Sequence, residues 1–209
     1  MVSQTNEQAL EAAIEKILTG YTQEELALKR AEGKSGQVAE PAELYRSGNG
    51  FYMGNPSDFD PKYAIDETRF WHFLENTQKD ELEKLQRSSD WKLKILERYD
   101  RMVKKYGVLR ILKKGLEVED AFFTLLYPMP LASSSQTAKD NFESNEFSVS
   151  RQIQYNPENL REEIDMVVFV NGLPLATLEL KNHWTGQNAK VHGIKQYKFD
   201  RDIRQPLLN

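Results

Sequence analysis

Residues 163–182, with the sequence EIDMVVFVNGLPLATLELKN, constrain the fold of this chain more than any other stretch. Two apolar runs flank Asn171-Gly172, and this dipeptide between apolar runs predicts a β-hairpin. The first run carries Asp165 near its start, and the second ends in Glu179-Leu180-Lys181. A hairpin this hydrophobic therefore carries three charges at its far end, and their purpose depends on where they point.

The register of the hairpin decides which charges share a face. A strict two-residue loop pairs Asp165 with Leu178 and turns Glu179 to the opposite face, because side chains alternate along a strand. One extra residue in the ladder, as a three-residue loop or a β-bulge, pairs Asp165 with Thr177 instead. Asp165, Glu179 and Lys181 then lie on one face, and this is the register that we predict.

Two carboxylates and an ammonium group at a water-accessible sheet end suit a particular chemistry. Mg²⁺ prefers oxygen ligands and keeps several of its waters. Such an ion activates bound water and neutralises charge that develops on a phosphate, while a lysine stabilises the transition state. The pattern predicts a Mg²⁺ site for phosphodiester hydrolysis at Asp165, Glu179 and Lys181. The three charges alone are also what the solvated end of an ordinary strand would carry, and such a pattern often arises by chance.

Composition excludes several other classes of protein. The 209 residues are 39% hydrophobic, which is enough for one large domain or two small ones. The chain has no cysteine, so it forms neither a disulfide framework nor a thiolate zinc site. The net charge of −4 argues against a general nucleic-acid coat, so any DNA contact requires a local basic patch. No window approaches the roughly 18 apolar residues of a membrane span, and we expect a soluble cytoplasmic protein without a membrane partner.

The order of predicted elements indicates helices first and strands later. The expected helices cover 5–18, 66–87, 90–106 and 187–202, and the expected strands cover 119–128, 146–155 and the hairpin 164–181. Residues 29–64 are Gly- and Pro-rich and expected to be irregular, and the polar stretch 132–145 is expected to be a binding loop. We expect an α/β fold in which a mostly helical part, 1–115, packs on a core formed by 116–209, together as one compact domain.

The first predicted helix has a regular apolar stripe. Its members are Ala9, Leu10, Ala13, Ile14, Ile17 and Leu18, and we expect this stripe to face the core. Glu7 lies at the edge of the stripe, and Glu11 is expected to point further toward solvent.

The wording around the charges closely resembles a known family. The hairpin with its Glu-Leu-Lys-Asn ending, the later QYKFDRD at 196–202, the upstream NEFSVSRQIQY and the opening NEQALEAAIEKILTGY are similar to the N-terminal nuclease region of type I restriction endonuclease R (HsdR) subunits. The resemblance covers 5–21 and 140–202 well and 22–115 weakly. It implies a PD-(D/E)xK, restriction-endonuclease-like mixed β-sheet flanked by helices, which cuts DNA with Mg²⁺.

The resemblance also implies residue roles in the hairpin. Asp165 and Glu179 match the metal ligands of the family, and Lys181 matches its catalytic lysine. Ile164 replaces the proline of the nominal PD motif, which has little mechanistic consequence.

Roles outside the hairpin are less direct. Gln196 matches the glutamine of the family's Q-x-x-x-Y element, but Asp200 stands where that element has tyrosine. Glu7 matches an outer carboxylate that some relatives place near the metal, although a surface glutamate favoured by the helix dipole explains it equally well. The basic residues of the last predicted helix either contact phosphates or form its solvated face: Lys190, Lys195, Lys198 and Arg201.

The resemblance predicts a function as well as a fold. The expected activity is that of a Mg²⁺-dependent endonuclease domain that cuts double-stranded DNA after ATP-driven translocation, alongside specificity and methyltransferase subunits. The stretch EGKSG at 32–36 lacks the upstream glycine of a phosphate loop, because Leu28 stands in its place. We therefore expect the ATP-driven motor to be absent from this chain, as in an N-terminal fragment or a truncated gene. The alternatives are a non-catalytic DNA-binding or assembly module with the same fold and a stand-alone PD-(D/E)xK repair nuclease.

Overall fold

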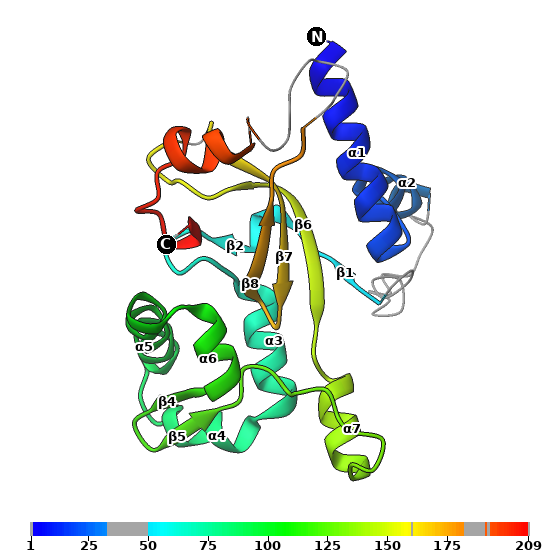
Figure 1. The fold of residues 1–209 in the computed structure, drawn as a ribbon. Helices are drawn as coiled ribbons and strands as arrows, with labels where there is room; N and C mark the ends of the chain where they lie inside the picture. Colours follow the sequence, from blue (N-terminus) through cyan, green and yellow to red (C-terminus); the bar gives the residue numbers. More distant parts are fainter. Residues whose placement is uncertain (1, 33–49, 160, 182–190, 192, 209) are drawn as a thin grey trace.

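A four-stranded mixed sheet forms the centre of the computed structural model, which describes residues 2–32, 50–159, 161–181, 191 and 193–208 (Figure 1). Its strands lie in the order β1 (Tyr52–Met53), β6 (Phe147–Gln154), β7 (Glu163–Val170) and β8 (Leu173–Leu178). Strand β1 runs parallel to β6, and the β6–β7 and β7–β8 pairs are antiparallel. The prediction of an α/β fold with a mixed sheet is confirmed.

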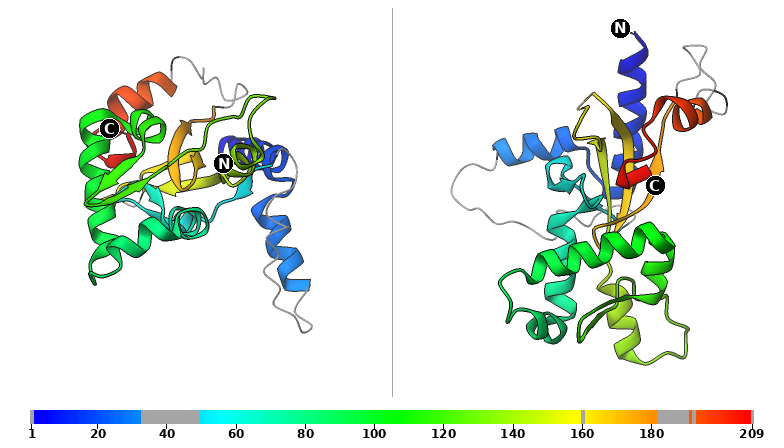
Figure 2. Two further views of the ribbon diagram at one scale, coloured as in Figure 1. Left: turned by 90° about the horizontal axis from the view of Figure 1, so that it is seen from below. Right: turned by 90° about the vertical axis from the view of Figure 1, so that its left-hand side faces the viewer.

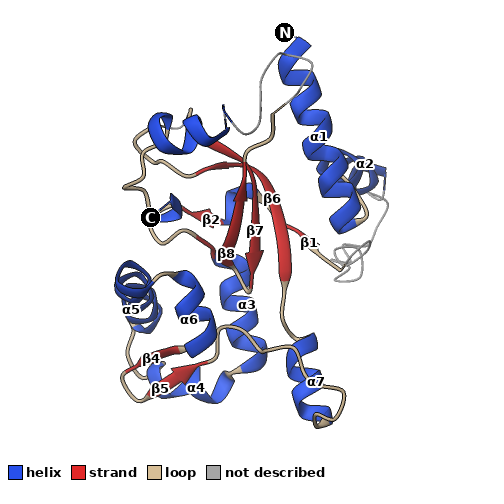
Figure 3. Ribbon diagram, in the orientation of Figure 1, coloured by secondary structure: helices blue, strands red, loops and turns tan. Residues whose placement is uncertain are grey.

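Helices surround this sheet at both ends. They are α1 (Val2–Thr19), α2 (Gln23–Glu32), α3 (Glu67–Thr77), α4 (Lys79–Leu85), α5 (Trp91–Tyr106), α6 (Val108–Lys114) and α7 (Gln136–Glu143), with a π-helical turn at Gln196–Asp200 and short 3₁₀ turns at Pro56–Asp58 and Pro206–Leu208. Two small hairpins complete the fold, β2 (Phe59–Asp60) with β3 (Ile65–Asp66) and β4 (Leu116–Val118) with β5 (Ala121–Phe123) (Figure 3). Figure 2 shows α3 to α6 gathered at the turn end of the β7–β8 hairpin, away from α1.

Three predicted elements are wrong in extent. The single helix expected over 66–87 is broken at Gln78, whose side-chain amide instead bonds both backbone groups of Thr124 at 2.6 and 2.9 Å. The strand expected over 119–128 is only three residues long and pairs with β4 outside the central sheet. The loop expected over 132–145 contains α7, which begins where the Ser135 hydroxyl accepts a hydrogen bond from the Ala138 amide at 3.3 Å.

Other predicted elements fall differently. Helix α5 follows the expected bounds and ends at Gly107, whose φ of 78° only glycine adopts easily. The region 29–64, expected to be irregular, contains the end of α2 and the short strand β1. A strand of two residues is too short to produce a periodic pattern in the sequence. Of the helix expected over 187–202, residues 187–190 and 192 lie outside the described residues. The division at residue 115 remains a prediction.

The hydrophobic interior is divided between the two ends of the hairpin. The larger cluster joins α3 to α6 and the β4–β5 hairpin with Val170 and Leu173 at the turn. The smaller cluster lies at the other end and contains Ile153, Tyr155, Ile164, Val167 and Phe169. Burial at both ends fixes the position of β7 and therefore of the charges it carries.

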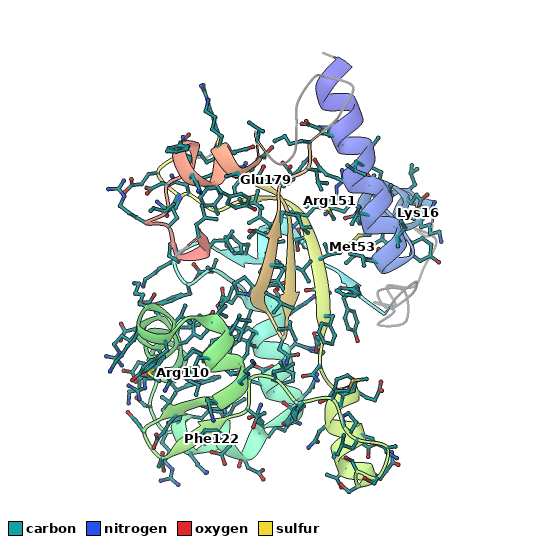
Figure 4. The ribbon with its side chains drawn as sticks, viewed as in Figure 1. Lys16, Met53, Arg110, Phe122, Arg151 and Glu179 are labelled. Atoms are coloured by element: carbon teal, nitrogen blue, oxygen red, sulfur yellow. The ribbon has the colours of Figure 1, made fainter. Side chains whose placement is uncertain are left out.

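The expected orientation of α1 is wrong. Glu11 and Glu15 are buried, with 4% and 0% of their surface exposed, whereas Leu10 and Ile17 are 41% and 63% exposed. The reason is Arg151 on β6, whose buried guanidinium bonds Glu11 and Glu15 at 3.3 and 3.1 Å. An ion-paired network, rather than the apolar stripe, holds this helix to the sheet (Figure 4). Within the described residues, no helix is long and apolar enough to cross a membrane.

Candidate active site

The hairpin contains the predicted extra residue, but in a different position from the one expected. Its turn has two residues, Asn171 and Gly172, with φ of 52° and 78°, so the three-residue loop is wrong. The ladder instead shifts between Val168 and Phe169, where Leu175 on β8 is left without a partner. The adjacent Pro174 has no backbone N–H to donate, which favours a bulge at this point of the edge strand.

This bulge sets the face on which the charges lie. It pairs Val167 with Thr177 and Met166 with Leu178, so the expected pairing of Asp165 with Thr177 is wrong. Continued by one residue, the same register places Asp165 opposite Glu179, on one face of the hairpin. The register of the ladder therefore puts the two carboxylates on the same face, as predicted.

Asp165 and Glu179 lie close enough for their charges to interact. One Asp165 carboxylate oxygen accepts a hydrogen bond from the Leu180 amide at 2.5 Å, which fixes it against the end of β8. The side chain of Glu179 is 1% exposed. Burial, and then the Asp165 charge, raise the pKa of Glu179 to about 7, although Arg201 and Lys181 lower it. The interaction of the two carboxylates thus disfavours two negative charges.

Two cations accompany this carboxylate pair. The Lys181 ammonium lies 3.8 Å from Glu179 Oε2, and its side chain is 12% exposed. Arg201 donates to Glu179 Oε1, and its side chain is 6% exposed. Among the residues that the structure describes, none provides a hydrogen-bond partner for the buried Glu179 Oε2.

The geometry fits a divalent cation held by few protein ligands. A buried carboxylate oxygen without a donor is costly, and a cation beside it removes that cost. Among the residues that the structure describes, no set of three His, Cys, Asp or Glu side chains is placed to hold a metal ion. Mg²⁺ needs no such set, because it is commonly bound through one or two carboxylates with waters and substrate phosphate. Asp165 and Glu179 are the residues that could hold it.

The C-terminal segment closes one side of the site. Tyr197 donates a hydrogen bond from its hydroxyl to Thr177 Oγ1 at 2.9 Å, and the Arg201 guanidinium lies 5.4 Å from the Tyr155 ring. Gln196 is half-buried, and its backbone carbonyl accepts the Arg201 amide at 3.0 Å. The sequence predicts that Arg201 either contacts phosphate or lies on a solvated helix face. Arg201 does neither, because it is buried against Glu179.

Helix α1 contributes the carboxylate of Glu11, which is buried and not directed toward solvent as expected. The pKa of Glu11 is raised by burial and by the charge of Asp165, while Arg151 opposes this shift. The side-chain amide of Gln152 donates a hydrogen bond to the Glu11 carboxylate at 3.3 Å. Gln152 has a φ of 53° and lies in the part of β6 that is next to Asp165 on β7. Glu11 is four residues from both Glu7 and Glu15, and this spacing indicates that the three glutamates share one face of the helix.

The remaining predicted residues lie apart from this cluster or outside the described chain. Glu7 is half-buried one turn before Glu11, and its role as a metal ligand remains a prediction. Lys195 and Lys198 are exposed, and Lys190 lies outside the described residues.

Comparison with known proteins identifies the family of the chain. A family described as type I restriction enzyme R protein N terminus (HSDR_N) matches residues 4–208. No curated protein and no solved structure matches the chain. Since the match spans almost every residue, including both α1 and the C-terminal segment that close the site, the chain belongs to the family of type I restriction enzyme R protein N-terminal regions.

Proposed function

We propose that the β7–β8 site is a Mg²⁺-dependent nuclease centre that hydrolyses phosphodiester bonds of double-stranded DNA. The family places the chain in a restriction enzyme subunit, which acts on DNA within a restriction-modification complex. The observation that carries the finer proposal is Glu179 Oε2, a buried carboxylate oxygen near Lys181 that has no hydrogen-bond donor among the described residues, on a side chain whose charge interacts with that of Asp165.

Each side chain has a distinct part in this proposal. Asp165 and Glu179 hold the cation, and Asp165 is kept in place by the Leu180 amide. When bound, Mg²⁺ supplies a Lewis acid that neutralises charge on the scissile phosphate. Lys181 directs its ammonium toward the attacking water or a phosphate oxygen, where it stabilises developing negative charge. Arg201 orients Glu179 through its carboxylate and is a positioning residue.

We further propose the setting in which this centre acts. DNA translocation driven by ATP is supplied outside these 209 residues, and target recognition is supplied by specificity and methyltransferase subunits. Cleavage by the site itself is then independent of base sequence, because the residues above address phosphate rather than base edges.

Nicking of supercoiled plasmid in Mg²⁺ tests the proposal. We expect the wild-type chain to convert supercoiled DNA to open circles, and Asp165→Asn and Lys181→Met to lower that rate by at least roughly a hundredfold, within the range found when an electrostatic stabiliser is removed. Glu163→Gln is the matched control, since Glu163 is an exposed carboxylate on the same strand. Equal nicking by all four proteins would assign the activity elsewhere and favour a non-catalytic role for the hairpin.

A further inference from the structure

Helices α5 and α6 concentrate positive charge on an acidic protein. Residues 91–114 contain nine Lys and Arg but only Glu97 and Asp100 as acids, a local excess of seven positive charges in a chain of net charge −4. Lys94, Arg98, Arg101 and Lys105 recur at the spacing of one helical stripe along α5. This surface lies beside the turn end of the hairpin, well apart from Glu179, as the labels of Arg110 and Glu179 in Figure 4 show.

Local structure accounts for only part of this charge. Lys94 pairs with Glu119 at 2.9 Å, Lys104 pairs with Asp100 at 2.8 Å, and Arg98 donates to the Glu117 carbonyl at 3.0 Å. Lysines in the last turns of both helices also favour the helix dipoles. Neither these contacts nor the helix dipoles account for Arg101 and Arg110, which are both exposed. Arg101 lies before the last turn of α5, and Arg110 lies in the middle of α6.

Two cations without a carboxylate ion pair among the described residues lie against one exposed aromatic ring. Lys105 and Arg110 lie 5.0 and 4.4 Å from the ring centre of Tyr106. The hydrogen bond from Lys105 and the charges of Lys105, Arg110 and Arg98 lower the pKa of the Tyr106 phenol. Within the described residues, no ion pair joins a carboxylate to Arg101, Lys105 or Arg110, although Glu97, Glu117 and Glu119 line the same hollow as Arg101.

We propose that this basic surface, defined by Arg98, Arg101, Lys105, Tyr106 and Arg110, binds the phosphate backbone of duplex DNA outside the nuclease centre. A row of cations that repeats along a helix matches a row of phosphates, and it supplies affinity without base recognition. Arginine and aromatic side chains together are typical of nucleic-acid surfaces rather than of simple solubility. The identity of the ligand rests on the proposed function, but its binding does not require hydrolysis.

The surface and the nuclease centre lie at opposite ends of the β7–β8 hairpin. Helix α6 packs on β8, whose far end leads to Glu179. A strand of this length spans about 20 Å. At about 3.4 Å per step along each DNA strand, this corresponds to about six base pairs.

The test is the salt dependence of binding to a labelled 30-base-pair duplex in EDTA, measured by fluorescence anisotropy. Removing Mg²⁺ separates this test from cleavage, so the two proposals can fail independently. We expect Arg101→Gln/Lys105→Gln/Arg110→Gln to weaken binding by at least roughly tenfold at 0.1 M salt and to lower the slope of log affinity against log salt by about two to three. Replacement of both arginines by lysine should preserve the slope, because it preserves charge.

The matched control neutralises three exposed or half-exposed lysines on other elements, as Lys29→Gln/Lys79→Gln/Lys139→Gln. We expect this control to leave the slope near that of the wild type. An equal loss in both triple variants, no binding by the wild type, or a lysine variant as weak as the glutamine variant would overturn the proposal. Equally tight binding of polyglutamate and duplex DNA at matched salt would also overturn the proposal, because the partner would then be an acidic protein segment.

Discussion

At the scale of single residues, the site is a balance of two acids and two cations. Glu179 has Asp165 as its acidic neighbour, Arg201 on one carboxylate oxygen and Lys181 near the other. Among the described residues, this arrangement leaves one buried oxygen, Glu179 Oε2, without a hydrogen-bond donor and able to accept a further cation. Arg201 binds the opposite oxygen and thereby directs the free one toward Lys181.

A second buried acid, Asp66, lies on another element and predicts a pH effect on stability. Its side chain caps α3 by accepting the Arg69 amide at 3.1 Å, and burial raises its pKa to about 6 although Arg69 opposes the shift. The folded protein thus holds a proton that the unfolded chain releases near pH 4, so this contribution to stability is lost as the pH rises from about 4 to about 6.

Asp66→Asn should remove this dependence while it keeps the cap, because Asn caps helices as well as Asp does. Relative to the wild type, we expect the variant to gain about 1–3 kcal/mol of unfolding free energy between pH 4.5 and pH 7. Urea denaturation at both values of pH measures this difference. Parallel curves for the two proteins would show that Asp66 titrates normally.

At the scale of elements, the hairpin turn is fixed by direct contact with α3. The Gly172 carbonyl accepts the Asp66 amide at 2.8 Å, and a Cβ added to Gly172 would lie 2.5 Å from the Phe70 nitrogen and 2.6 Å from the Asp66 carbonyl oxygen. Both near atoms are backbone, so the helix itself would have to move.

Gly172→Ala should therefore destabilise the fold more than Gly107→Ala does. Both glycines have φ of 78°, but an added Cβ at Gly107 meets nothing within 4 Å. Backbone strain alone costs about 1–3 kcal/mol at such positions. We expect that cost for Gly107→Ala and a loss at least about 2 kcal/mol larger for Gly172→Ala, of the size that overpacked cores show. Equal midpoints of thermal unfolding would contradict the close packing of the turn on α3.

Helix α1 is held to the sheet by ion pairs, so its attachment should depend strongly on the cation of Arg151. Arg151→Met leaves Glu11 and Glu15 buried without their cation, and breaking a buried pair in this way costs about 3–5 kcal/mol. We expect amide hydrogen exchange to accelerate in α1 and α2 before it does in β7. Arg161→Met is the control, because Arg161 is exposed. Faster exchange spread evenly over the whole sheet would mean that Arg151 does not specifically anchor these helices.

At the scale of the whole molecule, the site joins segments from both ends of the chain. Glu11 comes from the first helix, Asp165 and Glu179 from the central hairpin, and Arg201 from the C-terminal segment. The structure thus places the candidate site at the opposite end of the hairpin from its turn and from the basic surface of α5 and α6 (Figure 1).

How far the sequence predicts this arrangement depends on the range of the interactions. The Asn171-Gly172 turn follows from local chemistry, and the shared face of Asp165 and Glu179 was predictable once one extra residue was placed in the ladder, although its position at Leu175 was not. The face of α1 that packs on the sheet was not predictable. The apolar stripe indicates the opposite face, and only the ion pairs with Arg151, which is distant in sequence, turn Glu11 and Glu15 inward. Arg201 was missed for the same reason, since its partner lies 22 residues away.

Calorimetric titration of Mg²⁺ into the full chain tests the central claim most directly. At pH 8, above the pKa of about 7 of Glu179, we expect one ion to bind per wild-type chain. Asp165→Asn and Glu179→Gln should each weaken this binding by at least roughly tenfold, comparable to the loss of about one charge-assisted ligand, and Glu163→Gln should leave it unchanged. The same Mg²⁺ affinity in all four proteins, or no binding by the wild type, would contradict a metal site between Asp165 and Glu179.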